Sequence, residues 1–247
     1  MRLSVLGAGP AYTNRQDAAG AAYLVEDAGT RLLLDLGQGA FPRIFRHVDP
    51  AALDVVAVSH LHPDHFIDLV PLRHYLRYEF DPPRRVLVLG PQGLADRLDA
   101  LHAEPGFSAE ALDCELLGTA PHRVGTLVIE ARLVAHTDES YAMRVAATAG
   151  PGLVYSGDCG RADDLAPLIR PGDTLLTEVA FGVGPVPPGV MHLDASAVGE
   201  LAAATRPGRI LLTHVLSWCD LDATIAAVRN RWDGPVEFVW PGSALDV

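Results

Sequence analysis

The feature that constrains this chain most is a run of metal-binding residue types directly after an apolar, strand-like segment, 55–58. Four potential ligands follow it in the pattern H-x-H-x-D-H: His60, His62, Asp64 and His65. Residues two apart on an extended strand point the same way, so His60 and His62 can hold one cation while Asp64 and His65 turn toward a second. Imidazole and carboxylate ligands suit zinc or another divalent transition metal.

Three more residues of ligand type stand where apolar, strand-like runs end. They are His136, Asp158 and His214. Strand ends in a layered α/β fold form a common rim, where binding sites usually lie. A single His or Asp after a strand is more often a cap or a turn residue. Together with the first cluster, however, these three become candidates for the same metal site.

These residues carry a resemblance that covers nearly the whole chain. The chain resembles the metallo-β-lactamase-fold hydrolases. Within them it is most similar to the phosphodiesterase branch, which includes the tRNA 3′-processing endonuclease RNase Z and small bacterial cyclic-nucleotide phosphodiesterases. Residues 6–10 match the glycine-rich first loop of that branch, residues 90–93 its G-P-x-G turn, residues 156–158 the segment with its bridging aspartate, and residues 211–214 its last ligand segment.

The resemblance implies a four-layer αββα sandwich, an α/β fold of two similar halves, in one domain spanning 1–247. It also implies two divalent metal ions, with zinc favoured and manganese the alternative. By the same resemblance, one ion is held by His60, His62 and His136, and the other by Asp64, His65 and His214, with Asp158 bridging the two.

A Glu…His pair completes the resemblance, in the segments that carry Glu178 and His192. Two divalent ions about 3.5–4 Å apart can share and activate one water for attack on phosphorus. In this reading His192, oriented by Glu178, is the general acid for the leaving group, a role worth about 10²–10⁴-fold in rate. Asp64 or Asp158 could steer the attacking water through its second oxygen.

The chain departs from the endonuclease pattern in three places. Phe66-Ile67-Asp68 stands where a glycine is usual, and residues 215–219 replace the usual Ser-x-Arg-Tyr-like segment. The protruding arm that grips tRNA has no obvious counterpart in the sequence. A small phosphodiester substrate is therefore favoured over tRNA.

The charge of the chain also favours a small substrate over tRNA. The sequence has 31 acidic residues and 19 basic ones, all of the basic ones Arg, for a net charge of −12. Proteins hold long nucleic acids mainly through Lys and Arg contacts to phosphates. We therefore expect a small-molecule phosphodiester, with a cyclic nucleotide favoured, and no long nucleic acid. The alternatives are a tRNA 3′-processing endonuclease, a lactone or thioester hydrolase, and a non-catalytic binding protein of the same fold.

The alternation of apolar runs predicts the order of the elements. The first half should hold strands 3–6, 21–26, 31–35, 55–58 and 86–89, with helices 40–47, 66–78 and 94–102. The second half should hold strands 114–117, 126–134, 141–146, 153–156, 174–178, 210–212 and 236–240, with helices 163–168, 194–205 and 222–229. Helices on the outer faces of two such sheets would bury these runs.

The remaining features set limits on location and assembly. No apolar run approaches 18 residues, so no membrane span is expected, and the apolar part of residues 1–10 is too short for a signal peptide. Three widely spaced cysteines predict no disulfide framework and favour the reducing cytoplasm. Homodimer formation stays open, as does substrate contact by Tyr141, Arg144 or Trp218, for which ordinary packing is the simpler role.

Overall fold

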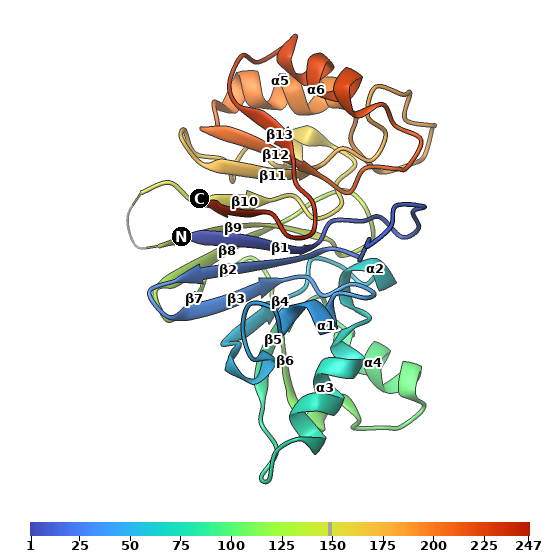
Figure 1. Cartoon of the computed structure of the whole chain (residues 1–247), viewed down its shortest axis with the longest axis vertical. Helices are drawn as coiled ribbons and strands as arrows, with labels where there is room; N and C mark the ends of the chain where they lie inside the picture. The colour runs from blue at the N-terminus through green and yellow to red at the C-terminus, as the bar shows by residue number, and fades with distance from the viewer. Residues whose placement is uncertain (148–149) are drawn as a thin grey trace.

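The computed structural model describes residues 1–147 and 150–247. Two seven-stranded sheets pack face to face, and helices cover the outer face of each sheet (Figure 1). The four-layer αββα sandwich predicted from the sequence is confirmed. Among the described residues, no helix is long and apolar enough to cross a membrane.

The first sheet has the strand order β14-β1-β2-β3-β4-β5-β6. Its strands are β14 (Ala244–Asp246), β1 (Arg2–Gly7), β2 (Ala22–Asp27), β3 (Thr30–Leu34), β4 (Val55–Ala57), β5 (Val86–Gly90) and β6 (Leu112–Leu116). Strands β3 to β6 run parallel, whereas β14, β1, β2 and β3 pair in antiparallel fashion. The parallel strands β3 and β4 therefore end at the same edge of the sheet.

The second sheet has the order β13-β12-β11-β10-β9-β8-β7. Its strands are β13 (Val236–Phe238), β12 (Arg209–Thr213), β11 (Thr174–Glu178), β10 (Leu153–Tyr155), β9 (Tyr141–Ala147), β8 (Leu127–Leu133) and β7 (His122–Val124). Strands β10 to β13 are parallel to one another. Residues that follow β10, β11 and β12 are thus brought to one edge, as the sequence pattern requires of a shared site.

Helices form the two outer layers. In Figure 1, α5 (Ala195–Thr205) and α6 (Leu221–Arg229) lie at the top, over the second sheet, while α1 (Phe41–Ile44), α3 (Leu69–Tyr78) and α4 (Leu94–His102) lie over the first. The short α2 (Pro63–Phe66) follows β4. Asp194 and Asp220 cap α5 and α6 by accepting backbone N–H groups, which satisfies donors that have no partner within the helix.

Three apolar layers hold the four structural layers together. The central layer fills the space between the sheets and includes Tyr23 and Tyr155, whose ring centroids are 5.1 Å apart. The second packs α1, α3 and α4 against the first sheet, and the third packs α5 and α6 against the second. Each sheet is therefore apolar on both faces, which explains why its central strands read as continuous apolar runs.

Three strands differ from the prediction. The strand expected at 114–117 in the second half is β6, which pairs in parallel with β5 and so belongs to the first sheet. The C-terminal strand β14 returns to pair with β1 and was not predicted. It is only three residues long, as is β7, which was also missed, so neither strand is long enough to give a periodic signal.

Two expected helices also differ. The single helix 66–78 is divided into α2 and α3, because the Asp68 N–H bonds the Leu36 carbonyl and the Asp68 side chain accepts from Phe41 N. The helix expected at 163–168 is only a 3₁₀ turn, Ala162–Asp164. Pro167 explains the shortening, since proline disfavours helical backbone at the preceding residue and lacks an N–H.

Candidate metal centre

All seven ligands predicted from the sequence converge at the edge where parallel strands of both sheets end. They come from the loop after β4, from α2 and from the loops after β8, β10 and β12. Their donor atoms form two groups, in each of which every atom lies within 4.8 Å of the others. The first group is His60, His62, His136 and Asp158, and the second is Asp64, His65, Asp158 and His214. Asp158 therefore belongs to both groups.

The first group brings three imidazole rings around one point. His62 Nδ1 lies 3.0 Å from Nε2 of His60 and 3.0 Å from Nε2 of His136. Asp158 Oδ2 is 3.8 Å from His60 Nε2 and 3.6 Å from His136 Nε2. Nitrogen and oxygen donors gathered this closely fit a divalent cation that prefers imidazole and carboxylate ligands.

Hydrogen bonds to the ring nitrogens that face away from this group orient its imidazole rings. His136 Nδ1 donates a hydrogen bond to the Met191 carbonyl at 2.7 Å, which leaves Nε2 as the atom that faces the group. Ser59 Oγ lies 3.1 Å from Nδ1 of His60, so that His60 also presents Nε2. Such outer hydrogen bonds fix the tautomer and the ring direction of metal-binding histidines.

The second group contains buried polar atoms that no protein hydrogen bond satisfies. Asp158 Oδ1 is 3.3 Å from His65 Nε2 and 3.4 Å from His214 Nε2, and Asp64 Oδ2 is 3.2 Å from His214 Nε2. Within the described chain, Asp158 Oδ1 and His65 Nε2 are buried without a hydrogen-bond partner. An unsatisfied buried group costs about 1–3 kcal/mol. A cation between these atoms would remove that cost, so the donor set fits a metal here as well.

The protonation states of Asp158 and His60 suit metal binding. Burial opposes ionisation of Asp158, but the neighbouring His214 and His65 hold the pKa of this carboxyl well below its usual value. Burial, assisted by His65, holds the pKa of His60 well below that of a free imidazole. An ionised carboxylate and a neutral imidazole are the forms that bind metal ions.

Asp35 is a residue of this site that the sequence analysis missed. It is completely buried at the end of β3, and its Oδ2 lies 2.7 Å from His65 Nδ1. The same oxygen accepts from the hydroxyl of Tyr155 at 2.6 Å, and the backbone N–H of Ser59 donates to Oδ1 at 2.6 Å. Asp35 thus holds His65 with Nε2 turned toward the metal-ligand set.

The backbone at this edge is also strained. Asp35 has φ 57° and His214 has φ 53°, in the left-handed region that residues with a side chain seldom occupy. Strain of this kind clusters at functional sites, where the surroundings hold it in place. Asp35, like Asp158, follows an apolar strand in the sequence. This position is the sequence signal that could have identified it.

Glu178 and His192 adjoin the second group. Glu178 is the last residue of β11 and is completely buried, and both of its carboxylate oxygens lie 3.0 Å from His192 Nδ1. The backbone N–H of Cys159 donates to Glu178 at 2.7 Å, next to Asp158. Burial would lower the pKa of His192, but the hydrogen bond and charge of Glu178 outweigh it and raise that pKa to about 9.

A cavity of about 460 Å³ lies over the centre. Five of the predicted site residues line it: His62, Asp64, Asp158, His192 and His214. The other lining residues are apolar or aromatic: Pro10, Ala11, Tyr12, Pro63, Ala180, Phe181, Val190 and Leu216. The metal-binding residue types therefore form one part of a pocket whose other walls are mostly apolar.

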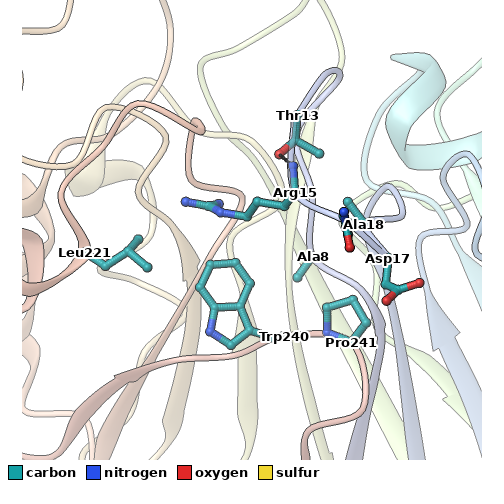
Figure 2. A pocket seen from close by; sticks show the side chains of 10 residues that line it. Ala8, Thr13, Arg15, Asp17, Ala18, Leu221, Trp240 and Pro241 are labelled. Atoms are coloured by element: carbon teal, nitrogen blue, oxygen red, sulfur yellow. Dashed lines mark hydrogen bonds between the residues drawn. The ribbon is translucent and has the colours of Figure 1, made fainter.

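A second cavity, of about 400 Å³, shares no lining residue with the first (Figure 2). Arg15 extends over the indole of Trp240, with its Cζ 4.8 Å from the ring centroid. Its Nη1 donates to the Val215 carbonyl at 3.1 Å. The guanidinium group of Arg15 is thus engaged in this second cavity.

The three side chains for which the sequence analysis left substrate contact open have ordinary hydrogen bonds or packing contacts. Arg144 is buried and bonds Asp173 through Nε at 2.7 Å and Nη2 at 2.9 Å, so it has a structural ion pair. The hydroxyl of Tyr141 donates to Glu139 at 2.6 Å. Trp218 is 58% exposed and packs edge-on against Phe181, which lines the cavity over the centre. Of the three, only Trp218 adjoins that lining.

Comparison with known proteins shows to which family this chain belongs. Residues 25–215 match the model of the beta-lactamase superfamily domain. The chain belongs to the beta-lactamase superfamily. An uncharacterized protein of Mycobacterium leprae, ML1173, is 34% identical over 100% of this chain and 89% of its own length. The probable metallo-hydrolase YhfI of Bacillus subtilis is 23% identical over 98% of this chain and 100% of its own length.

Solved structures of the superfamily have the same fold. The crystal structure of YhfI from B. subtilis has a TM-score of 0.88 at 22% identity and covers 99% of this chain and 98% of its own. Human short-form tRNase Z has a TM-score of 0.74 at 18% identity, covering 100% and 99%. A diphosphatase of the PhnP family has a TM-score of 0.77 at 14% identity, covering 100% and 97%. The metallo-β-lactamase fold predicted by resemblance is therefore confirmed.

Proposed function

We propose that this chain is a metal-dependent phosphodiesterase that acts on a small phosphodiester, with a cyclic nucleotide as the favoured substrate. The observation that carries the proposal is the pair formed by the buried Glu178 and the half-buried His192, beside the residue shared by both ligand groups. His192 Nδ1 is 4.0 Å from Asp158 Oδ2 and 3.0 Å from Glu178. A histidine that is held next to the ligand set can donate the proton that a phosphodiester with a poor leaving group needs.

The ligand roles follow the two groups of donor atoms. His60, His62 and His136 would hold one divalent ion, and Asp64, His65 and His214 the other, with Asp158 between them. Zinc is favoured by the imidazole-rich set, and manganese is the alternative. Two such ions, when bound, supply Lewis-acid activation of water and stabilise charge on the phosphoryl oxygens.

The protein's own side chains would then manage orientation and protons. Glu178 accepts from His192 Nδ1, so that Nε2 is the atom that gives its proton to the departing ester oxygen. Asp64 has a second carboxylate oxygen with which to orient the attacking water, whereas the two oxygens of Asp158 each face one ligand group. The apolar walls around Phe181 limit bulk water near the reacting bond, which strengthens these interactions.

The alternatives make different demands on the site. A lactone or thioester hydrolase has less need of a donor such as His192, since its leaving group departs more readily. A tRNA 3′-processing endonuclease must hold a long polyanion, which the net charge of −12 and the lack of Lys disfavour. A non-catalytic binding protein would have no reason to keep all seven ligands and the Glu178–His192 pair.

A hydrolysis screen tests the proposal. The zinc- or manganese-loaded protein would be assayed against cyclic AMP, cyclic GMP, bis(4-nitrophenyl) phosphate, precursor tRNA, a lactone and a thioester. We expect turnover of the small phosphodiesters, and its loss in Asp158→Ala but not in Asp163→Ala, a control at an exposed carboxylate outside both ligand groups. Hydrolysis of only the lactone or thioester, or faster cleavage of the tRNA, would overturn it.

A further inference from the structure

We propose that the cavity over the metal centre selects phosphodiesters that carry one negative charge and an aromatic ester group, and that Tyr12 and Phe181 determine this preference. The inference rests on the proposed phosphodiesterase function and specifies its substrate class. Three features carry it: the apolar walls of the cavity, the fixed position of Phe181, and the lack of Arg and Lys in the described lining.

The apolar walls come from three separate loops. Tyr12 lies in the loop after β1, Phe181 and Val190 lie in the loop after β11, and Leu216 follows β12. Tyr12 is 69% exposed and Val190 is 36% exposed, so large apolar surfaces face the cavity mouth rather than the core. Small-molecule sites commonly combine apolar walls with a few convergent polar groups, which is the arrangement here.

Phe181 is held close to the proposed proton donor. Its ring centroid is 6.2 Å from that of His192 and 6.0 Å from that of Trp218, which meets it edge-on. Trp218 in turn packs on Gly184, where a Cβ would come within 2.9 Å of the indole ring. An aromatic ester group bound beside Phe181 would therefore lie next to the reacting bond, with the geometry that aromatic pairs prefer.

Arg and Lys are missing from the described lining of this cavity, and the charge of its His192 is paired with Glu178. The sequence contains no Lys, and Arg15, which shares a loop with Tyr12, extends over Trp240 in the other cavity (Figure 2). A single phosphodiester charge can be neutralised at the metal centre. A second phosphate elsewhere on the substrate would meet the apolar walls and the net charge of −12 without a partner.

The aromatic preference is tested with diphenyl phosphate and dimethyl phosphate as competitive inhibitors of methyl 4-nitrophenyl phosphate hydrolysis. We expect Tyr12→Ala and Phe181→Leu each to lower the ratio of the two inhibition constants, dimethyl over diphenyl, about tenfold through weaker binding of the diaryl ester, on the scale of one lost apolar contact. Tyr78→Ala is the matched control, because Tyr78 is 65% exposed on α3 and outside the cavity. An unchanged ratio in both cavity variants would overturn the assignment.

The charge preference is tested with thymidine 5′-(4-nitrophenyl phosphate) and the same compound with a 3′-phosphate. We expect kcat/KM to be at least about tenfold lower for the compound with the extra phosphate, since its second phosphate must be desolvated without a cationic partner. Equal values would overturn the charge rule.

Binding separates this inference from the proposed activity. Calorimetry on the metal-loaded protein should give tighter binding of diphenyl phosphate than of dimethyl phosphate, and Tyr12→Ala should reduce the difference. That preference without any phosphodiester hydrolysis would contradict the phosphodiesterase proposal while supporting the ligand preference. Equal affinities would contradict the preference, whatever the turnover.

Discussion

His65 Nδ1 lies 2.7 Å from Oδ2 of Asp35, and both side chains are buried between the two sheets. The carboxylate holds the imidazole so that Nε2 faces Asp158, 3.3 Å away. The candidate metal-ligand set therefore depends on a residue that directly follows β3 and does not itself belong to either group of donor atoms. Asp35 also ties Tyr155 and Ser59 to this point, which joins the end of β3 to the ends of β4 and β10.

Changing Asp35 to Asn should weaken metal binding without removing a ligand. The expected loss of affinity is about 10–100-fold, the usual effect of losing an outer carboxylate on a metal-binding histidine. Competition with a chelator measures it, with Asp163→Asn as a control at an exposed carboxylate. If the affinity of Asp35→Asn equals that of the wild type, Asp35 does not orient His65 for a metal.

Changing Asp158 to Ala should cost more, because this residue belongs to both ligand groups. We expect the metal content to fall from two ions per chain to one or none and turnover to fall by orders of magnitude. The fold should persist, since the three apolar layers do not include this side chain. Elemental analysis and circular dichroism check both points, and a variant with two bound ions and near-normal turnover would refute a bridging role.

The sequence identified much of this site because chemistry and strand ends coincide in it. His60, His62, Asp64 and His65 follow one apolar run, and the other ligand candidates each follow another, so local patterns sufficed. Asp35 was missed because its partner His65 is 30 residues away and a lone strand-end aspartate resembles a turn residue. Its role arises from the packing of side chains between the sheets, which no local pattern reports.

The elements of the fold were likewise predicted where a local sequence pattern marks them and missed where it does not. Strand β11 and helix α4 were predicted with the bounds that the structure has, since each is a clear apolar or amphipathic run between turn residues. The sheet to which β6 belongs was not predictable, because strand partners are chosen by tertiary packing. The return of β14 to β1 is likewise a long-range pairing with little local signal.

The buried pair Arg144–Asp173 should contribute to stability and not to the metal site. Asp173→Asn leaves the buried guanidinium without its nearest charged partner, with only Glu130 at 3.6 Å remaining, and losing one partner of a buried ion pair typically costs about 3–5 kcal/mol of unfolding free energy. Denaturant titration measures the loss, and metal content should be unchanged. A variant that is as stable as the wild type, or one that loses metal, would contradict this role.

The effect of pH on that pair has a definite sign. Burial opposes ionisation of Asp173, but its hydrogen bonds with Arg144 lower its pKa below the ordinary value. A carboxyl with a lowered folded-state pKa stabilises the fold above its unfolded pKa of about 3.9 and loses this contribution as pH falls through the folded value. The stability gap between wild type and Asp173→Asn should therefore be full at pH 6 and narrow below about pH 4.

The cysteine thiols should react slowly in the native protein. Burial raises the pKa of Cys114 to about 11 and that of Cys159 to about 12, and it also raises the pKa of Cys219. At pH 8 only about 0.1% or less of the Cys114 and Cys159 thiols would be ionised, and the thiolate is the reactive form. A disulfide reagent followed by absorbance should label these two thiols slowly until urea is added. Rapid labelling without denaturant would show that they are accessible and ionised.

The last prediction separates proton donation from metal binding. His192→Ala should leave the metal content unchanged, because its Nδ1 is engaged by Glu178 and the group that it forms with Glu178 and His214 does not include Asp158. Turnover of a phosphodiester with a poor alkoxide leaving group, such as cyclic AMP, should fall about 10²-fold or more, the usual scale for losing a general acid. A diester with a nitrophenolate leaving group should lose much less, since nitrophenolate departs without a proton.

Because both substrates are compared within one variant, a general folding defect cannot produce this difference. Glu178→Gln provides the matched test of orientation, since it keeps the shape of the side chain but removes the charge that holds His192 Nδ1. We expect it to show the same dependence on the leaving group in weaker form. Equal losses on both substrates in His192→Ala, or loss of a metal ion, would mean that His192 is not the proton donor. The phosphodiester proposal would then lose the observation that favours it over lactone or thioester hydrolysis.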